Sequence, residues 1–360
     1  MVSLSPYKVE KKDIRALSEE GLVALFKDIG EPAFRAKQVY DWLWSKGLTD
    51  FAQMSNLSKS LRDYLEQHYT IQAVSLHEYQ VSKDRTIKCA MRLHDNYVVE
   101  SVLIPHQSRI TACISSQVGC SLTCSFCATG KLKRMRNLNA DEIFDQVVLI
   151  KNTAAEKYQA PLTNIVYMGM GEPLLNYKEV LSSVEKITSP KGLGMSPKRI
   201  TVSTAGVSKM IAKLGEDNVK FHLALSLHAA NDEKRNSIMP INESNSLQSL
   251  TESLTYFTEK TGTRPTLEYI AFRDFNDSLK DAEELYQFCR KVKSKVNVIE
   301  YNSVEGTAFQ QTSKERLAAF TQYLENKGVI VNVRHSRGKD IDAACGQLAN
   351  KNKLISPELK

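Results

Sequence analysis

The chain has 360 residues, of which 42% are hydrophobic and 25% are charged, and its formal net charge at pH 7 is +7. A chain of this length and composition predicts a globular protein with one large core and a smaller accessory unit. No run of about 18 apolar residues occurs, and the N-terminal sequence MVSLSPYKVEKKDIR lacks a signal-peptide pattern. We therefore expect a cytoplasmic protein without a membrane segment. The positive charge fits an anionic partner such as nucleic acid but does not require one.

The first 70 residues have apolar positions at helical spacing, in LSEEGLVALFKDIG, EPAFRAKQVYDWLW and NLSKSLRDYLEQHY. This pattern predicts a small helical accessory domain over residues 1–70. Its aromatic residues Phe34, Trp42 and Trp44 are better explained as core residues than as stacking platforms for nucleic acid bases.

Short alternating segments separated by turn-prone pairs follow, and they predict a β-hairpin connector over residues 71–108. Apolar strand-like runs then alternate with helix-period stretches, which is typical of parallel strands joined by helices. Polar groups such as Gly-Glu, Ser-Thr, Ser-Leu-His and Tyr-Asn close these strands. We therefore favour an α/β fold with a partial (β/α)6 TIM-like barrel over residues 109–348, rather than a doubly wound sheet. Residues 349–360 have the composition of a solvated tail.

Seven cysteines are present, and three of them fall within the segment GCSLTCSFCATG, at Cys120, Cys124 and Cys127. An odd count with such crowding argues against a disulfide framework and for metal binding or catalysis. Three thiolates on one loop can hold three irons of a 4Fe-4S cluster and leave the fourth iron open. A structural zinc site would need a fourth ligand from a distant part of the chain.

This Cys-x3-Cys-x2-Cys motif, with Phe126 before the third cysteine, resembles the radical S-adenosylmethionine superfamily. The segments SSQVGCSLTCSFCATG, MGMGEPLLN, TVSTAGV, SLHAANDEKR, MPIN and DIDAACGQLA follow in order from residue 115 to 349, and EPAFRAKQVYDW extends the likeness toward the N-terminus. Together they resemble the RlmN family of adenine-C2 RNA methyltransferases over nearly the whole chain. The resemblance implies a 4Fe-4S cluster and two S-adenosylmethionine molecules per turnover.

The resemblance also implies which residues bind S-adenosylmethionine. Gly171 and Glu172 match the GEP turn of the family, where a carboxylate can accept hydrogen bonds from the ammonium group of the methionine moiety. The remaining matches end successive strands, and they are Ser203, Ser226, Leu227, His228 and Asn302. Taken singly, each of these residues could instead serve a tight turn or a helix cap. Glu300 and Ser303 depart from the pattern of the family around Asn302, so the wall of the pocket there is less well predicted.

Two further cysteines and one acid match catalytic positions of the family. Cys345, in DIDAACGQL, matches the cysteine that becomes methylated on sulfur, Cys113 matches the second redox cysteine, and Glu100 matches a proposed proton acceptor. The alternatives are inert buried thiols and, for Glu100, a solvent-facing carboxylate on a strand. Cys89 and Cys289 match no motif, and we expect them to be inert.

The resemblance implies a two-step scheme. The Cys345 thiolate first takes a methyl group from one cofactor molecule. A 5'-deoxyadenosyl radical from a second molecule then removes hydrogen from that methyl group, and the carbon radical adds to C2 of adenine. Attack of Cys113 on the Cys345 sulfur releases the product and leaves a transient disulfide. A flavodoxin-type electron donor is the expected partner.

The expected substrates are an adenine of 23S rRNA near the peptidyl-transferase centre and an adenine of tRNA beside the anticodon, each presented out of its stack. Two basic runs suit a phosphate backbone, and they consist of Lys131, Lys133, Arg134 and Arg136 and of Arg334, His335, Arg337 and Lys339. We expect a monomer. Three other interpretations remain: a Cfr-like adenine-C8 methyltransferase, a non-catalytic iron-sulfur RNA-binding module, and a radical activase that acts on a protein.

Overall fold

The structure, a computed structural model, describes residues 11–349 and divides them into two compact units. The first unit comprises residues up to Val74 together with Glu185–Met195, and the second comprises Ser75–Val184 and the residues from Ser196 onward. The predicted tail lies outside the described residues, except for residue 349. Among residues 11–349, no helix is long and apolar enough to cross a membrane.

The first unit is mainly helical. Its elements are β1 (Lys12–Asp13), η1 (Ile14–Ala16), α1 (Glu19–Asp28), α2 (Ala33–Tyr40), η2 (Asp41–Ser45), η3 (Phe51–Gln53), α3 (Lys59–His68) and β2 (Tyr69–Thr70). Serines begin two of the helices, because Ser18 Oγ accepts from Gly21 N–H and Ser58 Oγ accepts from Leu61 N–H. Trp44 is 1% exposed, as predicted for a core residue, whereas Phe34 is 53% exposed, so its assignment to the core was wrong.

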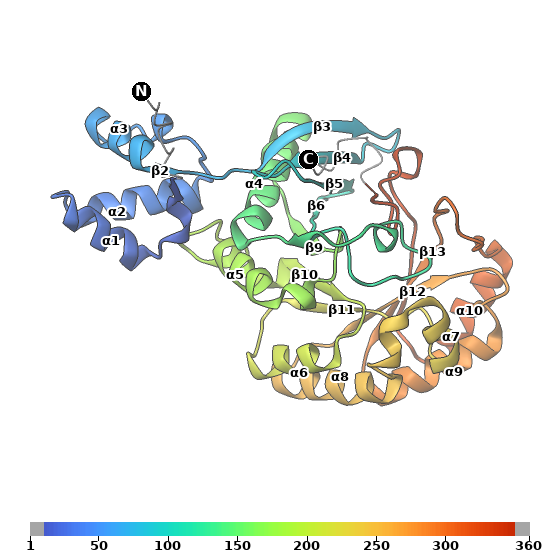
Figure 1. Cartoon of the computed structure of the whole chain (residues 1–360). Helices are drawn as coiled ribbons and strands as arrows, with labels where there is room; N and C mark the ends of the chain where they lie inside the picture. Colours follow the sequence, from blue (N-terminus) through green and yellow to red (C-terminus); the bar gives the residue numbers. More distant parts are fainter. Residues whose placement is uncertain (1–10, 350–360) are drawn as a thin grey trace, which may run out of the picture. The chain divides into compact units, whose positions relative to one another are not determined.

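The second unit is built on one ten-stranded sheet with the order β14-β13-β12-β11-β10-β9-β6-β5-β4-β3 (Figure 1). The strands are β3 (Ser75–Val81), β4 (Ile87–Arg92), β5 (Val98–His106), β6 (Arg109–Cys113), β9 (Asn164–Tyr167), β10 (Ile200–Thr204), β11 (His222–Ser226), β12 (Thr266–Ala271), β13 (Lys295–Glu300) and β14 (Val331–Arg334). The strands from β6 to β14 pair in parallel, while β3, β4, β5 and β6 pair antiparallel. The segment predicted as a separate hairpin connector therefore extends the same sheet.

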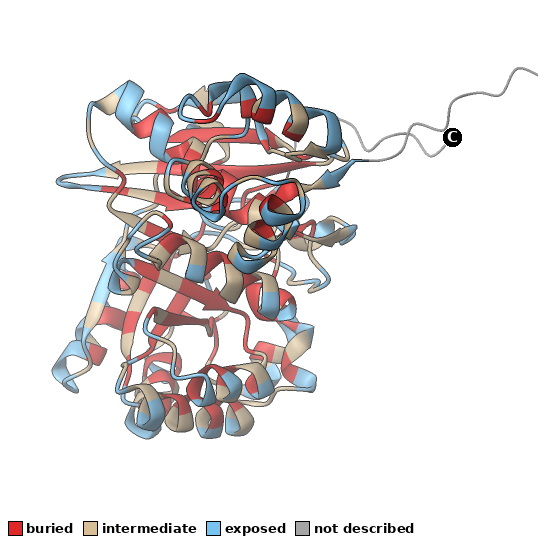
Figure 2. Cartoon of the chain, turned by 90° about the vertical axis from the view of Figure 1, so that its left-hand side faces the viewer, coloured by how far each residue is buried: buried red, intermediate tan, exposed pale blue. Residues whose placement is uncertain are grey.

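Helices connect the parallel strands, and α6 to α10 lie along one side of the sheet in Figure 1. The helices are α4 (Ala140–Tyr158), α5 (Tyr177–Thr188), α6 (Ser208–Glu216), α7 (Asp232–Ile238), α8 (Leu247–Thr261), α9 (Leu279–Lys291) and α10 (Lys314–Asn326). The shorter elements are β7 (Gln117–Val118), η4 (Thr129–Lys131), β8 (Arg136–Asn137), η5 (Pro173–Asn176), η6 (Pro197–Arg199), η7 (Pro240–Glu243) and η8 (Lys339–Ile341). Central strands such as β12 are buried on both faces, and the helices expose their outer faces (Figure 2).

The sheet is open, but side chains bridge its two ends. Asp340, after β14, accepts hydrogen bonds from Ser82 Oγ and Lys83 N–H in the turn between β3 and β4. Asp84 in that turn accepts one from Gly338 N–H at 2.9 Å. These contacts hold the segment after β14 against the turn between β3 and β4 at the other end of the sheet. The curved sheet therefore forms a partial barrel.

Candidate active site

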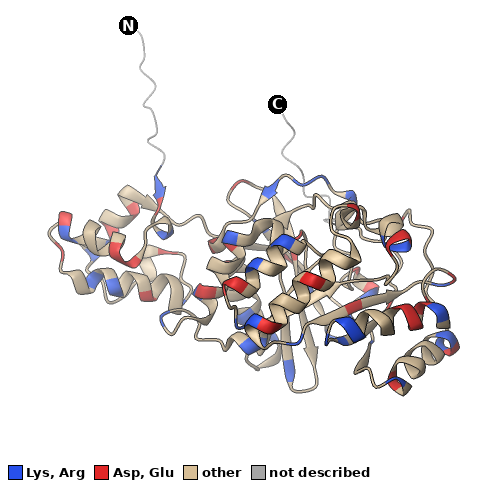
Figure 3. Cartoon of the chain, turned by 90° about the horizontal axis from the view of Figure 1, so that it is seen from below, with Lys and Arg blue, Asp and Glu red and all other residues tan. Residues whose placement is uncertain are grey.

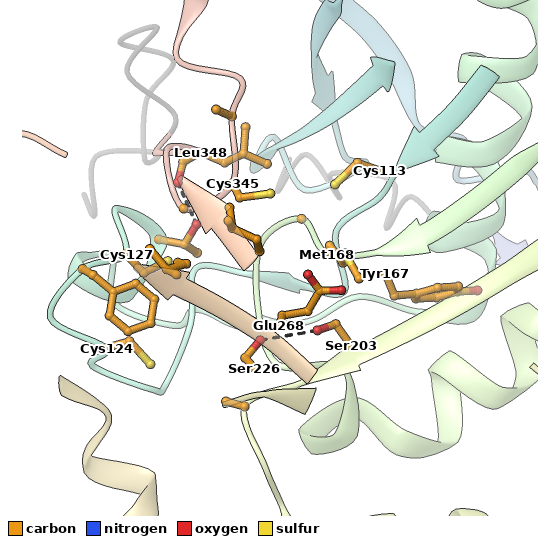
Figure 4. Close-up of a pocket in the computed structure, with 18 of the residues that line it drawn as sticks. Cys113, Cys124, Cys127, Tyr167, Met168, Ser203, Ser226, Glu268, Cys345 and Leu348 are labelled. Atoms are coloured by element: carbon orange, nitrogen blue, oxygen red, sulfur yellow. Dashed lines mark hydrogen bonds between the residues drawn. The ribbon is translucent and has the colours of Figure 1, made fainter. Parts of the chain in front are cut away.

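A cavity opens within the second unit at the carboxyl ends of the parallel strands (Figure 4). This is the edge where α/β barrels place their functional groups. The predicted site residues that line it are Cys113, Cys120, Cys124, Cys127, Gly171, Glu172, Ser203, Ser226, His228 and Cys345. Three predicted residues, Glu100, Leu227 and Asn302, do not line it. Cys89 and Cys289 also lie outside the cavity.

The loop that carries Cys120, Cys124 and Cys127 is held by backbone contacts. Cys127 N–H donates to Cys124 O at 3.2 Å, which makes a tight turn between two of the cysteines. A side chain at Gly130 would crowd this loop, because a Cβ there would lie 3.0 Å from Cys124 O and 3.1 Å from Leu122 O. Phe126 anchors the loop, since its ring packs edge-on against His228 with centroids 4.8 Å apart. The fold of this loop thus places three thiols in the lining of one cavity.

The donor set of this loop fits an iron-sulfur cluster. Burial raises the pKa of the free Cys120 thiol to about 11 and also raises the pKa values of Cys124 and Cys127. These thiols are only partly exposed, and a cationic iron that replaces their protons would stabilise the thiolate forms that burial disfavours. Within residues 11–349 no three such side chains converge on a single point as the ligands of one metal ion would. A cubane cluster requires another arrangement, because each thiolate binds its own iron.

The turn at Gly171 and Glu172 joins this loop to the strand ends. Glu172 is 3% exposed, and its carboxylate accepts from Leu174 N–H at 3.0 Å and from Ala205 N–H at 2.7 Å. Its own N–H donates to Gln117 Oε1 at 2.9 Å. Burial raises the pKa of Glu172, while these hydrogen bonds lower it. The carboxylate is therefore fixed in the cavity wall with oxygen lone pairs left for a cationic ligand.

Substitution of Gly171 by Ala is expected to weaken the binding of S-adenosylmethionine about tenfold or more. Gly171 has φ +95°, and an added Cβ would lie 2.5 Å from Gln117 Cβ and 2.8 Å from Gln117 N, so the turn that holds Glu172 must shift. Equilibrium binding to the reconstituted protein measures the effect. Gly262→Ala is the control, because Gly262 has φ +67° with nothing within 4 Å, so it should cost about 1–2 kcal/mol of stability and leave binding intact. Equal affinity of G171A and wild type would contradict this role.

The next strand ends supply short polar groups and a strained histidine. Ser203 and Ser226 approach each other with their Oγ atoms 3.5 Å apart, as Figure 4 shows. His228 is buried with φ +58°, a conformation that costs energy in a non-glycine residue. Its Nδ1 accepts from Ile270 N–H at 3.0 Å, so the proton of the neutral ring is on Nε2. Burial lowers the pKa of His228 to about 3, which keeps this ring neutral.

Asn302 and Leu227 stand behind the cavity wall. Asn302 Nδ2 donates to Cys345 O at 3.4 Å. Its Oδ1 is buried and has no hydrogen-bond partner among the described residues. A buried carbonyl oxygen without a donor is costly, so a ligand donor at this position would remove the penalty. Leu227 is fully buried; its N–H donates to Glu268 O at 3.0 Å, and its carbonyl accepts from Arg235 Nε at 3.1 Å.

The loop that carries Cys345 docks directly on the loop of the three cysteines. Ala128 N–H donates to Gly346 O at 2.8 Å, and Thr129 Oγ1 donates to Leu348 O at 2.7 Å. Cys345 is exposed toward the cavity, although protein atoms surround its thiol on most sides and raise its pKa. Sequence positions that are more than 200 residues apart thus meet at one site.

Cys113 ends β6 on the same cavity, and both it and Cys345 are free thiols. Burial raises the pKa of Cys113 to about 12, and a charge on Cys345 would raise it further. Figure 4 draws the two sulfurs on the same side of the cavity. The guanidinium of Arg334 lowers the pKa of both thiols. The pair therefore combines two thiols with one cation that favours their deprotonated forms.

Two cavity residues, Glu268 and Arg334, form a charge pair that the sequence analysis did not assign. Arg334 Nη1 lies 3.3 Å from Glu268 Oε2, and Asn297 Nδ2 donates to Glu268 Oε1 at 2.8 Å. The sequence places Arg334 only in a basic run. The sequence does contain a signal for this pair, which is the acid Glu268 in the middle of the apolar strand TLEYIA. A carboxylate at a buried position requires charged or hydrogen-bonding partners.

The basic runs are only partly free to meet an anion. Arg136 pairs with Glu142 at 2.7 Å and with Asp95 at 2.5 Å, so its role is structural. His335 and Lys339 both contact Glu300. Lys133 and Arg134 are exposed, and Figure 3 shows basic and acidic residues interspersed over the chain.

Glu100 is buried in the structure. The alternative interpretation of this residue, a solvent-facing carboxylate on a strand, is therefore wrong. It is 1% exposed, Lys88 Nζ lies 3.5 Å from its Oε1, and Ala349 N–H donates to its Oε2 at 2.8 Å. The carboxylate therefore anchors the chain just after the Cys345 loop.

Comparisons with known proteins show which family the chain resembles. Residues 12–71 match the family model of the ribosomal RNA large subunit methyltransferase N-terminal domain, and residues 114–289 match that of the radical SAM superfamily. A protein of Cytophaga hutchinsonii, named probable dual-specificity RNA methyltransferase RlmN, is 58% identical over 344 residues, which cover 96% of this chain and 94% of that protein. The dual-specificity RNA methyltransferase RlmN of Geotalea uraniireducens is 42% identical over 95% of this chain and 98% of its own.

A solved structure agrees as well. The crystal structure of a radical SAM methyltransferase from Sphaerobacter thermophilus superposes with a TM-score of 0.89 at 37% identity, and the match covers 94% of this chain and 99% of that chain. This match confirms the predicted α/β fold class.

Proposed function

The chain belongs to the RlmN family of radical S-adenosylmethionine RNA methyltransferases, and from that membership we propose that Cys345 carries the methyl group and Cys113 releases the product. The enzyme methylates C2 of an adenine in RNA and uses a 4Fe-4S cluster and S-adenosylmethionine as cofactors. The observation that carries the proposal is the docking of the Cys345 loop on the loop of Cys120, Cys124 and Cys127, through Ala128 and Thr129.

Cys120, Cys124 and Cys127 are proposed as the three ligands of the cluster. When bound, the cluster supplies the electron that cleaves S-adenosylmethionine to a 5'-deoxyadenosyl radical. C2 of adenine lies between two ring nitrogens and is electron-poor, so it does not attack the cofactor's methyl group as a nucleophile. A radical can add there, which is why the methyl group must first reside on a protein atom within reach of that radical.

Cys345 is proposed as that protein atom. Methyl transfer by displacement requires its thiolate, since the thiol is a weak nucleophile. Its surroundings raise the pKa, and Arg334 opposes that effect from the same cavity. Glu268 and Asn297 fix the position of Arg334. We propose that this cation stabilises the Cys345 thiolate, which the burial of the side chain alone would disfavour.

Cys113 is proposed as the resolving thiol. Its sulfur attacks the Cys345 sulfur, a Cys113–Cys345 disulfide forms, and the bond between the Cys345 sulfur and the transferred carbon breaks. Before this step, the radical formed by addition to the base must give up one electron, which the oxidised cluster would accept, and C2 must lose its hydrogen as a proton. The electron pair of the broken S–C bond then leaves with the carbon, which gains a proton and becomes the methyl group. Two electrons from outside the chain then reduce the disulfide, so we propose a flavodoxin-type donor as a partner.

Glu100 matches the family's proton acceptor, and its contacts also give it an anchoring role. The two roles predict different results for Glu100→Gln and Glu100→Ala. Gln retains an acceptor for Ala349 N–H but cannot take a proton, whereas Ala loses both. If anchoring dominates, only Ala should increase hydrogen exchange in residues 343–349 and lower activity strongly. If proton transfer dominates, both variants should lose activity while E100Q keeps the exchange rates of the wild type.

Gly171, Glu172, Ser203, Ser226, Leu227, His228 and Asn302 are proposed to bind S-adenosylmethionine. The fixed carboxylate of Glu172 and the unpaired Oδ1 of Asn302 support this assignment. A carboxylate suits the ammonium of the methionine moiety, and an amide oxygen suits an N–H or O–H donor.

The proposed substrates are 23S rRNA and tRNA, in line with the dual specificity in the names of the relatives. We propose that exposed Lys133 and Arg134, beside the cluster loop, contact the phosphate backbone, and that the enzyme is a cytoplasmic monomer.

Anaerobic incubation of the reconstituted enzyme with S-adenosylmethionine, a reductant and either RNA, followed by chromatography of the nucleosides, tests this function. We expect 2-methyladenosine from both RNAs. An 8-methyladenosine peak would instead indicate a Cfr-like specificity, against which Pro173 after Glu172 argues. No product from an enzyme with an intact cluster would contradict the proposal.

A further inference from the structure

Arg235 is a fully buried arginine whose hydrogen bonds all go to neutral oxygens. It lies on α7 and is 0% exposed. Nε donates to Leu227 O at 3.1 Å, Nη1 donates to Asn242 Oδ1 at 2.6 Å, and Nη2 donates to Ala205 O at 2.5 Å and to Ser226 O at 3.2 Å. Hydrogen bonds of this kind satisfy the donors but do not neutralise the charge. An uncompensated buried charge costs on the order of several kcal/mol, so a charge that is retained requires a counter-charge.

The helix that carries Arg235 is also the support of the cluster loop. Ser125 N–H donates to the carbonyl oxygen of Ile238, at the end of α7, at 3.0 Å. Cys124 packs against the apolar group that contains Ile238 and Met239. Arg235 lies one helical turn before Ile238 on α7, so the short helix that holds Ser125 and packs against Cys124 also carries the guanidinium. Arg235 therefore places a fixed positive charge beside one of the three proposed ligands.

The guanidinium also ties together the strand ends that frame the cofactor pocket. Its carbonyl partners follow β10 and end β11, where Ser203 and Ser226 line the cavity. Ala205, whose carbonyl accepts from Arg235, donates its N–H to Glu172 at 2.7 Å. One residue thus links the ends of two strands to the carboxylate proposed to bind the ammonium of the cofactor.

We infer that Arg235 is a positioning residue with two separable effects: its charge offsets the negative charge that the cluster gains on reduction, and its planar fork fixes the strand ends at the S-adenosylmethionine site. A cluster held by three thiolates is anionic and gains one more negative charge when it takes up an electron, so a buried cation beside it favours the reduced state. The fork supplies several donors in fixed directions, which Lys cannot reproduce. The inference rests on the proposed cluster ligands.

The charge effect is tested by a redox titration of the full-length, reconstituted protein that is monitored by electron paramagnetic resonance. The positioning effect of the guanidinium is tested by equilibrium binding of S-adenosylmethionine. Arg235→Gln should move the midpoint potential to a more negative value, beyond the spread of replicate titrations. Arg235→Lys should keep the potential near that of the wild type but weaken cofactor binding about tenfold or more. A potential for R235Q equal to that of the wild type, or an equal shift in both variants, would overturn the inference.

A second pair of variants keeps the test decisive if R235Q does not fold. Asp232 is exposed on the same helix and is the acid that interacts with Arg235. Its Oδ1 accepts from Asn242 Nδ2 and Leu247 N–H, and both bonds persist with Asn. Asp232→Asn should therefore raise the potential, whereas Glu233→Gln, which removes a neighbouring exposed acid, should change it less. Equal effects of the two variants would overturn the charge role. Iron content is measured first, because a chain that binds no iron contradicts the cluster ligands and not Arg235.

Discussion

Replacement of Cys345 with Ala is expected to abolish RNA methylation while the cluster, S-adenosylmethionine binding and RNA binding remain. In the proposed mechanism, the Cys345 thiolate is the group that accepts the methyl group from the cofactor by displacement. Its loop is fixed by backbone atoms, since Gly346 O and Leu348 O accept from the neighbouring loop. Removal of one sulfur therefore leaves the loop in place but removes the carrier of the methyl group.

Methylation of RNA and mass spectrometry of the Cys345 peptide check this result. Cys289→Ala is the matched control, because Cys289 is a partly buried thiol on α9 outside the cavity and should retain full activity. A non-catalytic iron-sulfur RNA-binding module predicts that neither variant changes anything. Unchanged methylation by C345A would contradict the proposed mechanism.

Replacement of Cys113 with Ala is expected to trap the RNA on the enzyme. Without the second thiol, no group attacks the Cys345 sulfur, and the bond between that sulfur and the transferred carbon persists. Cys113 is 8% exposed and lines the cavity, so Ala removes the sulfur with little change of the strand end. The enzyme should still methylate Cys345 and should stall after the first addition to adenine.

A denaturing gel with labelled RNA measures the adduct. We expect a protein–RNA band with C113A that requires both S-adenosylmethionine and a reductant, and no band with the double variant C113A/C345A. Steady product formation by C113A without an adduct would show that another group resolves the intermediate.

The parallel core and the cysteine loop could be predicted from the sequence, because both depend on local signals. Runs such as TNIVYMG and PTLEYIAF correspond to β9 and β12, since buried parallel strands are continuously apolar. The spacing of Cys120, Cys124 and Cys127 places them on one loop. The approach of Cys345 to that loop depends on contacts across the barrel, and the motif resemblance alone indicated it.

Other features depend on tertiary contacts that no local pattern contains. The alternating segments after residue 71 indicated strands, but not that β3, β4 and β5 continue the main sheet. The sequence left Glu100 open between a proton acceptor and a surface carboxylate, because its partners Lys88 and Ala349 lie on other segments of the chain. Arg136 belonged to a basic run, and its pairing with Glu142 and Asp95 became visible only in the fold.

The most direct test of the central claim follows the methyl group from Cys345 to RNA. The enzyme is first methylated on Cys345 with S-adenosylmethionine that carries a fully deuterated methyl group, and it then turns over once with unlabelled cofactor and RNA. Because hydrogen abstraction removes one deuterium from the methyl group on Cys345 before the carbon reaches adenine, the 2-methyladenosine should contain two deuterium atoms. A product with an unlabelled methyl group would show direct transfer from the second cofactor molecule, and three deuterium atoms would show transfer without hydrogen abstraction; either result would contradict the proposed role of Cys345.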